Sequence, residues 1–110
     1  MILAHGDLVT AVVRGDFGKP RPALVVQANP YAEIHPSVTV CPLSSHLTGL
    51  RLFRVAIAAD QVNGLEAPSE VMVDKISSLR RDRIRDRIGK LSASDLGAVA
   101  EALRQWLAVG

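Results

Sequence analysis

The chain has 110 residues, of which 48% are hydrophobic and 4% aromatic, enough for one aliphatic core and too few for two. We therefore expect a single domain over residues 1–110. The lone Cys41 excludes a disulfide framework within one chain, and we find neither a signal peptide nor a run of about 18 apolar residues. These features predict a cytoplasmic protein without a membrane span, in which Cys41 is a buried, inert thiol.

Short runs rich in β-branched residues, bounded by Gly, Pro, Asn, Asp or Ser, predict the strands of a small antiparallel sheet. In chain order these runs cover residues 7–13, 22–28, 37–43, 52–58 and 70–76, with 85–91 as a candidate sixth strand. Residues 80–84 are compatible with one further helical turn.

From Ser92 onward the apolar period becomes helical, with apolar residues recurring at intervals of three and four. The stripe consists of Leu96, Val99, Ala100, Leu103, Trp106 and Leu107. Ser92, followed three residues later by Asp95, forms an N-cap arrangement that fixes the helix start. The expected fold is mainly β: a barrel-like sheet of five to six antiparallel strands, closed by a C-terminal amphipathic helix.

The segment Lys19-Pro20-Arg21-Pro22 stands directly before an apolar run. Each proline fixes its own φ and pushes the preceding residue toward extended geometry, so the segment should be a stiff lead-in to a strand. Arg21 is then held at a strand mouth. From the residues alone, its guanidinium could serve either a structural carboxylate or an anionic ligand.

The formal net charge of +2 is distributed unevenly. Residues 75–90 hold seven Lys or Arg against Asp82 and Asp86, a local excess of five positive charges. Such an asymmetry is typical of a face that meets a polyanion or an acidic partner. The ordinary alternative is a solvated surface on which arginines pair with nearby acids.

The sequence contains none of the common nucleotide-binding, hydrolase or metalloprotease motifs. Its three histidines show no metal-ligand spacing with Cys41, so no zinc site is predicted. Polar residues do occur at expected strand ends: Arg21, Ser44, Ser45, His46 and Asp74. Each has an ordinary interpretation as well, since Ser44 can be a turn residue, His46 an exposed loop residue, and Asp74 the partner of a nearby Arg.

Five segments, taken in order, resemble the MazF/PemK family of bacterial toxins over nearly the whole chain. They read GDLVTAVV, RPALVV, VTVCPLSS, VMVDKISSLRRDRI and IGKLSASDLGAVAEALRQWL. The resemblance implies an SH3-like barrel with a C-terminal helix, a fold shared with the gyrase poison CcdB, and a homodimer. It also implies a metal-independent endoribonuclease without a cofactor, which cuts single-stranded RNA, often mRNA, and is neutralised by a cognate antitoxin.

Carried over residue by residue, the resemblance places the family's catalytic arginine at Arg21 and its catalytic Thr or Ser at Ser44. Asp74 matches an acidic residue that helps to bind RNA in some members. Three departures stand out. The insertion before the Arg-Pro motif is reduced to GDFGK, Lys75 replaces the usual Gln, and Met72 stands where some members have Arg.

Metal-independent RNA cleavage needs in-line positioning of the reacting groups and stabilisation of the negative charge that builds on the phosphate. The planar guanidinium of Arg21 suits the second task, and Ser44 would orient the phosphate or the 2′-hydroxyl. No general base is assigned, although His46 is a candidate on chemical grounds. The expected substrate-binding residues are Phe17, Lys19, Ser45, His46, Asp74 and Lys75. Phe17 is equally compatible with stacking on a base and with a rim contact of the core.

Two other classes of function stay open at this point. One is a CcdB-like gyrase poison, which needs no catalytic pair; CcdB ends in Trp-Gly-Ile, whereas this chain ends in WLAVG. The other is a non-catalytic barrel that binds RNA or protein.

Overall fold

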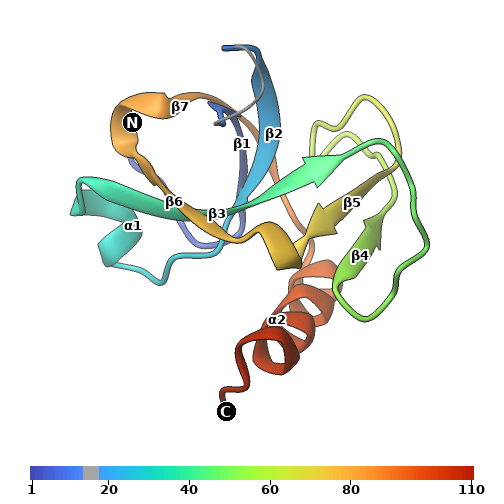
Figure 1. Cartoon of the computed structure of the whole chain (residues 1–110). Helices are drawn as coiled ribbons and strands as arrows, with labels where there is room; N and C mark the ends of the chain where they lie inside the picture. Colours follow the sequence, from blue (N-terminus) through green and yellow to red (C-terminus); the bar gives the residue numbers. More distant parts are fainter. Residues whose placement is uncertain (14–17) are drawn as a thin grey trace.

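The structure, a computed structural model, describes residues 1–13 and 18–110 and is built around a long, bent third strand (Figure 1). The strands are β1 (Asp7–Val12), β2 (Pro20–Val25), β3 (Ser37–Ser44), β4 (Arg54–Ile57), β5 (Ser69–Met72), β6 (Ser77–Arg80) and β7 (Ile84–Lys90). The helical elements are α1 (Tyr31–Ile34), the 3₁₀ turns η1 (Val73–Lys75) and η2 (Arg81–Arg83), and α2 (Ala93–Leu107).

All strand pairs within the described residues are antiparallel, and the strand order is β4-β5-β3-β2-β1-β7, with β6 paired to β3 as well. β3 connects the two parts of the sheet, because it pairs with β2 and β6 along its length and with β5 at its last two residues. The path from β4 to β7 does not return to its start, so the described sheet is not closed. Helix α2 packs against β4 and η1 (Figure 1).

The predicted elements are present, with one wrong prediction. The run 70–76 is not one strand: β5 ends at Met72, the chain turns through η1, and the additional strand β6 follows. The change of direction lets β5 pair with β4 while β6 pairs with β3. No Gly or Pro marks this turn, so the sequence pattern did not reveal it, and the sheet has seven described strands where five to six were expected.

Two other local predictions can be compared with the structure. The helical turn expected over 80–84 is found as η2, and the sixth strand expected over 85–91 is found as β7. The four-residue helix α1 was not predicted, because one turn is too short to show helical periodicity.

Helix α2 begins as predicted, since the Ser92 hydroxyl accepts a hydrogen bond from the Asp95 backbone N–H at 3.1 Å. Val99 and Ala102 are buried against the sheet. The apolar stripe extends beyond this cover, because Trp106 near the end of the helix is 48% exposed. None of the helices among the described residues is both long enough and apolar enough to cross a membrane.

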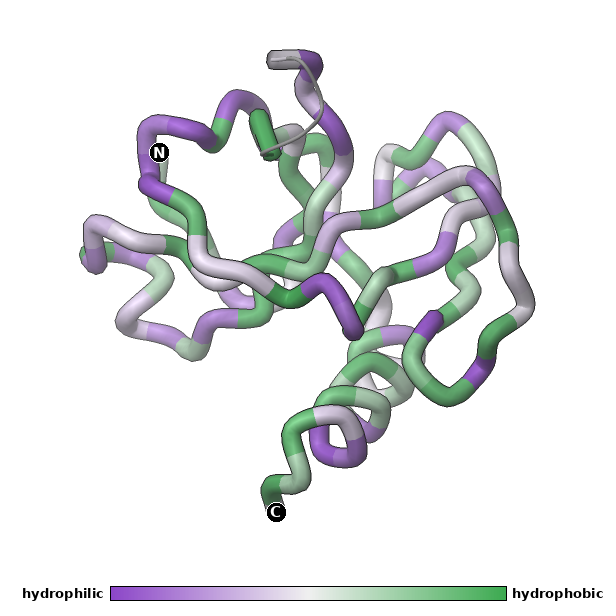
Figure 2. Tube along the Cα trace, viewed as in Figure 1, coloured by the Kyte–Doolittle hydropathy of each residue, from purple (hydrophilic) through white to green (hydrophobic). Residues whose placement is uncertain are grey.

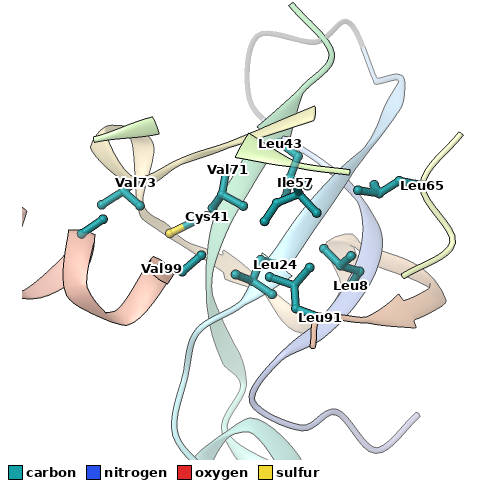
Figure 3. Packing of buried hydrophobic residues seen from close by; sticks show 11 residues of the cluster. Leu8, Leu24, Cys41, Leu43, Ile57, Leu65, Val71, Val73, Leu91 and Val99 are labelled. Carbon is teal, nitrogen blue, oxygen red and sulfur yellow. The ribbon is translucent and has the colours of Figure 1, made fainter. Parts of the chain in front are cut away.

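Apolar side chains pack on both faces of the sheet, because successive strand residues point to opposite sides. Leu8 of β1 and Leu24 of β2 belong to the cluster that faces α2 (Figure 3), whereas their neighbours Val9 and Val25 belong to a second cluster behind the sheet. Cys41 lies in the first cluster, and burial raises the pKa of its thiol to about 12. The prediction of a buried thiol is therefore confirmed.

Polar residues concentrate outside these clusters. Figure 2 shows apolar residues along the strands that cross at the centre of the molecule and hydrophilic residues on η2 and the beginning of β7. This hydrophilic stretch is the arginine-rich part of the sequence, and all three residues of η2 are at least partly exposed.

Candidate active site

Arg21 lies near the exposed start of β2, where the Lys-Pro-Arg-Pro segment becomes a strand. Ladder pairing with β1 begins at Pro20, opposite Val12, and places Arg21 opposite Ala11. The first two residues of β2 are exposed and the last three are buried, so the strand enters the core immediately after the two prolines. The strand-mouth position predicted for Arg21 is confirmed.

The strands β2 and β3 separate close to Arg21. Their pairing runs from Val25 opposite Val40 to Ala23 opposite Pro42, and after Pro42 strand β3 pairs with β5 instead. The same register, continued by two residues on each strand, aligns Arg21 with Ser44. The prolines at positions 22 and 42 lack the N–H group that would extend a ladder, which favours separation at this point.

A cleft of about 620 Å³ opens where the two strands diverge. Four predicted site residues line it together: Lys19, Arg21, Ser44 and Ser45. Its opposite wall includes Gly64, Leu65, Glu66 and Ala67 from the β4–β5 loop. The cleft therefore combines two cationic side chains with several hydroxyl groups, a donor set suited to a phosphate group.

The hydroxyl of Ser44 is placed by the turn that follows β3. Its oxygen accepts a hydrogen bond from the His46 backbone N–H at 3.1 Å, and the side chain is half-buried. A hydroxyl has one proton to donate in addition to its acceptor lone pairs. Ser44 can thus hold the turn and still donate to a ligand in the cleft.

The other predicted binding residues that the structure describes do not line this cleft. His46 lies exposed in the β3–β4 loop, while Asp74 and Lys75 lie in η1. Phe17 is outside the described residues. The described residues contain no group of three or more His, Cys, Asp or Glu side chains arranged to hold a metal ion.

Asp74 is engaged by an arginine, in agreement with its ordinary interpretation. Its two carboxylate oxygens accept hydrogen bonds from Arg54 Nε at 2.7 Å and Nη2 at 3.0 Å, and both side chains are mostly buried. The hydrogen bonds from Arg54 lower the pKa of Asp74 against the opposing effect of its burial. This pair ties η1 to β4.

Glu70 is a buried acid that the sequence analysis did not single out. Its carboxylate accepts hydrogen bonds from the backbone N–H groups of Thr48 at 3.0 Å and Gly49 at 2.9 Å, and from the Thr48 hydroxyl at 2.8 Å. The Thr48 N–H and then the Gly49 N–H are the main causes of its lowered pKa. Glu70 thereby anchors the β3–β4 loop, which follows Ser44.

The β4–β5 wall of the cleft is fixed by Asp60 and Asn63. The Asp60 carboxylate accepts from the backbone N–H of Val62 at 2.8 Å and of Asn63 at 2.7 Å. The buried Asn63 amide accepts from Leu65 N–H at 3.0 Å and donates to the Ala58 carbonyl at 2.8 Å. The sequence Asp-Gln-Val-Asn-Gly is a turn signal that could have drawn attention to this loop.

Most arginines of the 75–90 segment have local partners. Arg81 donates to the carbonyls of Ala32 at 2.6 Å and His35 at 2.9 Å. Exposed Arg80 pairs with Asp82 at 2.5 Å, and Arg87 pairs with Asp7 at 3.1 Å.

Two further arginines of this segment differ from each other. Arg85 donates to the Asp82 carbonyl at 2.7 Å. By contrast, no hydrogen bond or ion pair within the described residues involves Arg83, which is exposed. Local pairing thus accounts for most arginines of the segment, and among the described residues Arg83 is the arginine that it does not explain.

Comparison with known proteins gives consistent matches over nearly the whole chain. The sequence model of the PemK-like, MazF-like toxins of type II toxin-antitoxin systems matches residues 4–107. A protein of Mycolicibacterium smegmatis described as a probable endoribonuclease MazF is 33% identical over 108 residues, which make up 97% of this chain and 98% of that protein.

Solved structures match equally well. The Mycobacterium tuberculosis toxin MazF-mt6 has a TM-score of 0.81 at 29% identity, covering 94% of this chain and 98% of that chain. A MazE-MazF structure from Deinococcus radiodurans has a TM-score of 0.83 at 26% identity and covers 100% of both chains. These matches confirm the predicted fold type.

Proposed function

Because the chain belongs to the PemK-like, MazF-like toxins of type II toxin-antitoxin systems, we propose that it is an endoribonuclease that cleaves single-stranded RNA. The observation that carries the proposal is the cleft between β2 and β3, which Arg21 and Ser44 line together. The substrate is mRNA in the bacterial cytoplasm, cut at a short sequence, so that translation and growth are inhibited.

The reaction uses the 2′-hydroxyl of RNA as the nucleophile. This oxygen bonds to the adjacent phosphorus while the bond from phosphorus to the 5′ oxygen breaks, giving a 2′,3′-cyclic phosphate and a 5′-hydroxyl end. Arg21 donates hydrogen bonds to the phosphate oxygens as negative charge builds on them, and Ser44 orients the phosphate. No metal is required for these steps, because the nucleophile belongs to the substrate and the charge is met by the guanidinium.

RNA binding extends beyond the reacting phosphate. Lys19 and Ser45 line the same cleft. In the proposed complex they bind the phosphates next to the one that reacts. His46 and Lys75 lie outside the cleft and contribute only where the strand continues past it. For Phe17 we propose stacking on a base of the RNA. Asp74 contributes to RNA binding indirectly, because its pairing with Arg54 holds η1 against β4.

We also propose a homodimer formed through a second, apolar groove. This groove of about 680 Å³ lies between α2 and the β3–β4 loop and is lined by Leu47 and Leu52 among others. Leu52 is 76% exposed, and Trp106 adds apolar surface at the adjacent helix end. Exposed apolar patches of this kind are typical of protein interfaces. Light scattering should show a dimer at micromolar concentration and a monomer for Leu52→Asp.

The second proposed partner is a cognate antitoxin, in keeping with the MazE-MazF assembly solved for the Deinococcus relative. An acidic, disordered segment of the antitoxin would occupy the cleft, because its carboxylates match the same two cations that bind phosphate. Antitoxin binding and RNA cleavage are then mutually exclusive.

Incubation of the pure protein with a long single-stranded RNA in EDTA tests the proposed function. We expect cuts at a recurring short sequence that leave 5′-hydroxyl ends. Arg104→Ala serves as the matched control, because Arg104 is exposed on α2, does not line the cleft, and its guanidinium pairs with Glu101 on the same helix. Absence of cleavage, or inhibition of DNA gyrase instead, would contradict the proposal.

A further inference from the structure

The proposed reaction needs a group that accepts the proton of the 2′-hydroxyl. The polar residues that line the cleft include the hydroxyl residues Ser44, Ser45 and Ser69, which are poor bases, and the cations Lys19 and Arg21, which carry their protons already. Glu66 is the only carboxylate among the described residues that line the cleft. Among the described residues that line the cleft, Glu66 is therefore the one whose side chain can act as a general base.

The Glu66 carboxylate is not engaged elsewhere in the described part of the chain. No hydrogen bond or ion pair among the described residues involves it, whereas the nearby acids Glu70 and Asp74 accept three and two hydrogen bonds respectively. An unengaged anion in a cleft that binds a polyanion weakens binding by repulsion. A carboxylate that accepts a proton in the reaction would speed catalysis, and this gain would compensate for the weaker binding of RNA.

The backbone that carries Glu66 is rigidly placed. Leu65, the preceding residue, is 8% exposed and points into the core cluster (Figure 3). Its N–H is held by Asn63, and Gly64 lies so close to β7 that a Cβ there would overlap the carbonyl oxygen of Ile88. The side chain of Glu66 is exposed, but its Cα is held at a fixed place in the lining of the cleft, which limits how far the carboxylate lies from the cleft.

We propose that Glu66 is the general base of the cleft, a proposal that rests on the proposed ribonuclease function. The carboxylate takes the proton from the 2′-hydroxyl as the oxygen bonds to phosphorus. The 5′ oxygen leaves and takes up a proton from water, and Glu66 then returns its proton to solvent. Arg21 stabilises the charged phosphate throughout, so the cation and the anion of the cleft have separate tasks.

The test compares wild type, Glu66→Gln and Glu66→Asp in single-turnover cleavage of a short RNA between pH 4 and pH 8. In the wild type the rate should fall at acid pH as the carboxylate becomes protonated. Glu66→Gln should lower the rate by roughly 10²-fold or more and abolish this fall, while Glu66→Asp retains it at a reduced rate. Glu33→Gln, an exposed acid on α1, is the matched control and should behave as wild type.

Binding of an uncleavable 2′-O-methyl RNA separates catalysis from a structural role. If Glu66 is the base, Glu66→Gln should bind this RNA as tightly as the wild type or more tightly. Binding that weakens in proportion to the rate would overturn the proposal, as would a Glu66→Gln protein with an unchanged pH profile. Asp16 lies outside the described residues, and its substitution Asp16→Asn is measured in the same way. An acid fall in rate that Asp16→Asn abolishes and Glu66→Gln leaves in place would also reject the proposal.

The two proposals fail in different ways. A wild-type protein that cleaves no RNA contradicts both of them. A wild type that cleaves, with Arg21→Ala inactive and Glu66→Gln unimpaired, contradicts the role of Glu66 and leaves the ribonuclease function standing.

Discussion

At the scale of single residues, the position of Arg21 follows from the two prolines beside it and from the divergence of β2 and β3 after Pro42. The prolines restrict the backbone before the strand enters the core, so the backbone that carries Arg21 would lose little conformational entropy in binding the proposed phosphate. A preorganised charged donor of this kind is most effective in the transition state.

Arg21→Ala should therefore reduce RNA cleavage by two orders of magnitude or more, which corresponds to roughly 3 kcal/mol of transition-state stabilisation. Arg21→Lys should restore little, because an ammonium group cannot reproduce the planar pair of donors. Single-turnover rates on a defined RNA measure both effects, and circular dichroism checks the fold. A folded Arg21→Ala protein with a near wild-type rate would refute the catalytic role.

Gly64 shows how one residue fixes a cleft wall. Its φ of +70° lies in the left-handed region, and an added Cβ would meet the Ile88 backbone. Gly64→Ala should lower the free energy of unfolding by about 2 kcal/mol or more, measured by urea denaturation.

Gly97 provides the matched control for Gly64. It lies on the exposed face of α2 with no atom near its Cβ position. Gly97→Ala should raise the free energy of unfolding by roughly 0.5 to 1 kcal/mol through helix propensity alone. Equal effects of the two substitutions would contradict the close packing of the loop on β7.

At the scale of elements, the arginine-rich stretch divides into structural and solvent-facing members. Arg81 reaches back from η2 to the last carbonyls of α1 and its neighbour His35 and holds that short helix against the sheet. Its Nη1 atom is buried and has no partner in the described part of the chain. Arg83, two residues further along, is exposed.

Alanine substitutions should therefore separate these two arginines. Arg81→Ala should lower the free energy of unfolding by about 1 to 3 kcal/mol, because two hydrogen bonds from a charged donor are lost. Arg83→Ala should leave stability unchanged and, if Arg83 contacts RNA, should reduce the salt slope of binding by roughly 0.7. Urea denaturation and titration of uncleavable RNA at several salt concentrations measure the two effects.

Each outcome has a clear contrary result. A destabilised Arg83→Ala protein would contradict its exposed position. An unchanged salt slope with weakened antitoxin binding would assign Arg83 to the inhibitor interface instead.

At the scale of the whole molecule, two acids, one in β5 and one in η1, connect the β4–β5 part of the sheet to the β3–β4 loop and to helix α2. Glu70 holds the β3–β4 loop, and Asp74 holds Arg54 of β4. Arg54 also lies 5.9 Å from the ring centre of Phe53, whose ring is 5.7 Å from that of Trp106 on α2. The sheet, the loop and the helix are thus joined through charged and aromatic side chains.

This arrangement predicts loss of stability in acid. Folding lowers the pKa of both Glu70 and Asp74. Their contribution to stability is therefore complete above the pKa of an unfolded carboxylate, about 4, and is lost as the pH falls through their pKa in the folded state. Urea midpoints measured from pH 7 down to pH 3 should therefore fall most steeply below about pH 4. Asp74→Asn should be less stable than wild type at pH 7 and show a smaller loss at low pH; parallel curves would contradict the prediction.

Local patterns in the sequence were sufficient to predict most strands, the N-cap at Ser92, the buried thiol of Cys41 and the strand-mouth position of Arg21. These features depend on the periodicity of burial and on the backbone preferences of neighbouring residues, both of which are encoded within a few positions. The catalytic roles of Arg21 and Ser44 were predicted from the family resemblance and stay predictions.

The partners of the buried acids were decided only by the tertiary structure. Glu70 and Thr48 are 22 positions apart, Asp74 and Arg54 are 20 apart, and no local pattern specifies such pairs. The same holds for Glu66, which enters the cleft only because its loop packs on β7 opposite the diverging ends of β2 and β3. Elements are determined largely by neighbours in sequence, whereas a site is determined by contacts between residues that folding brings together across the sheet.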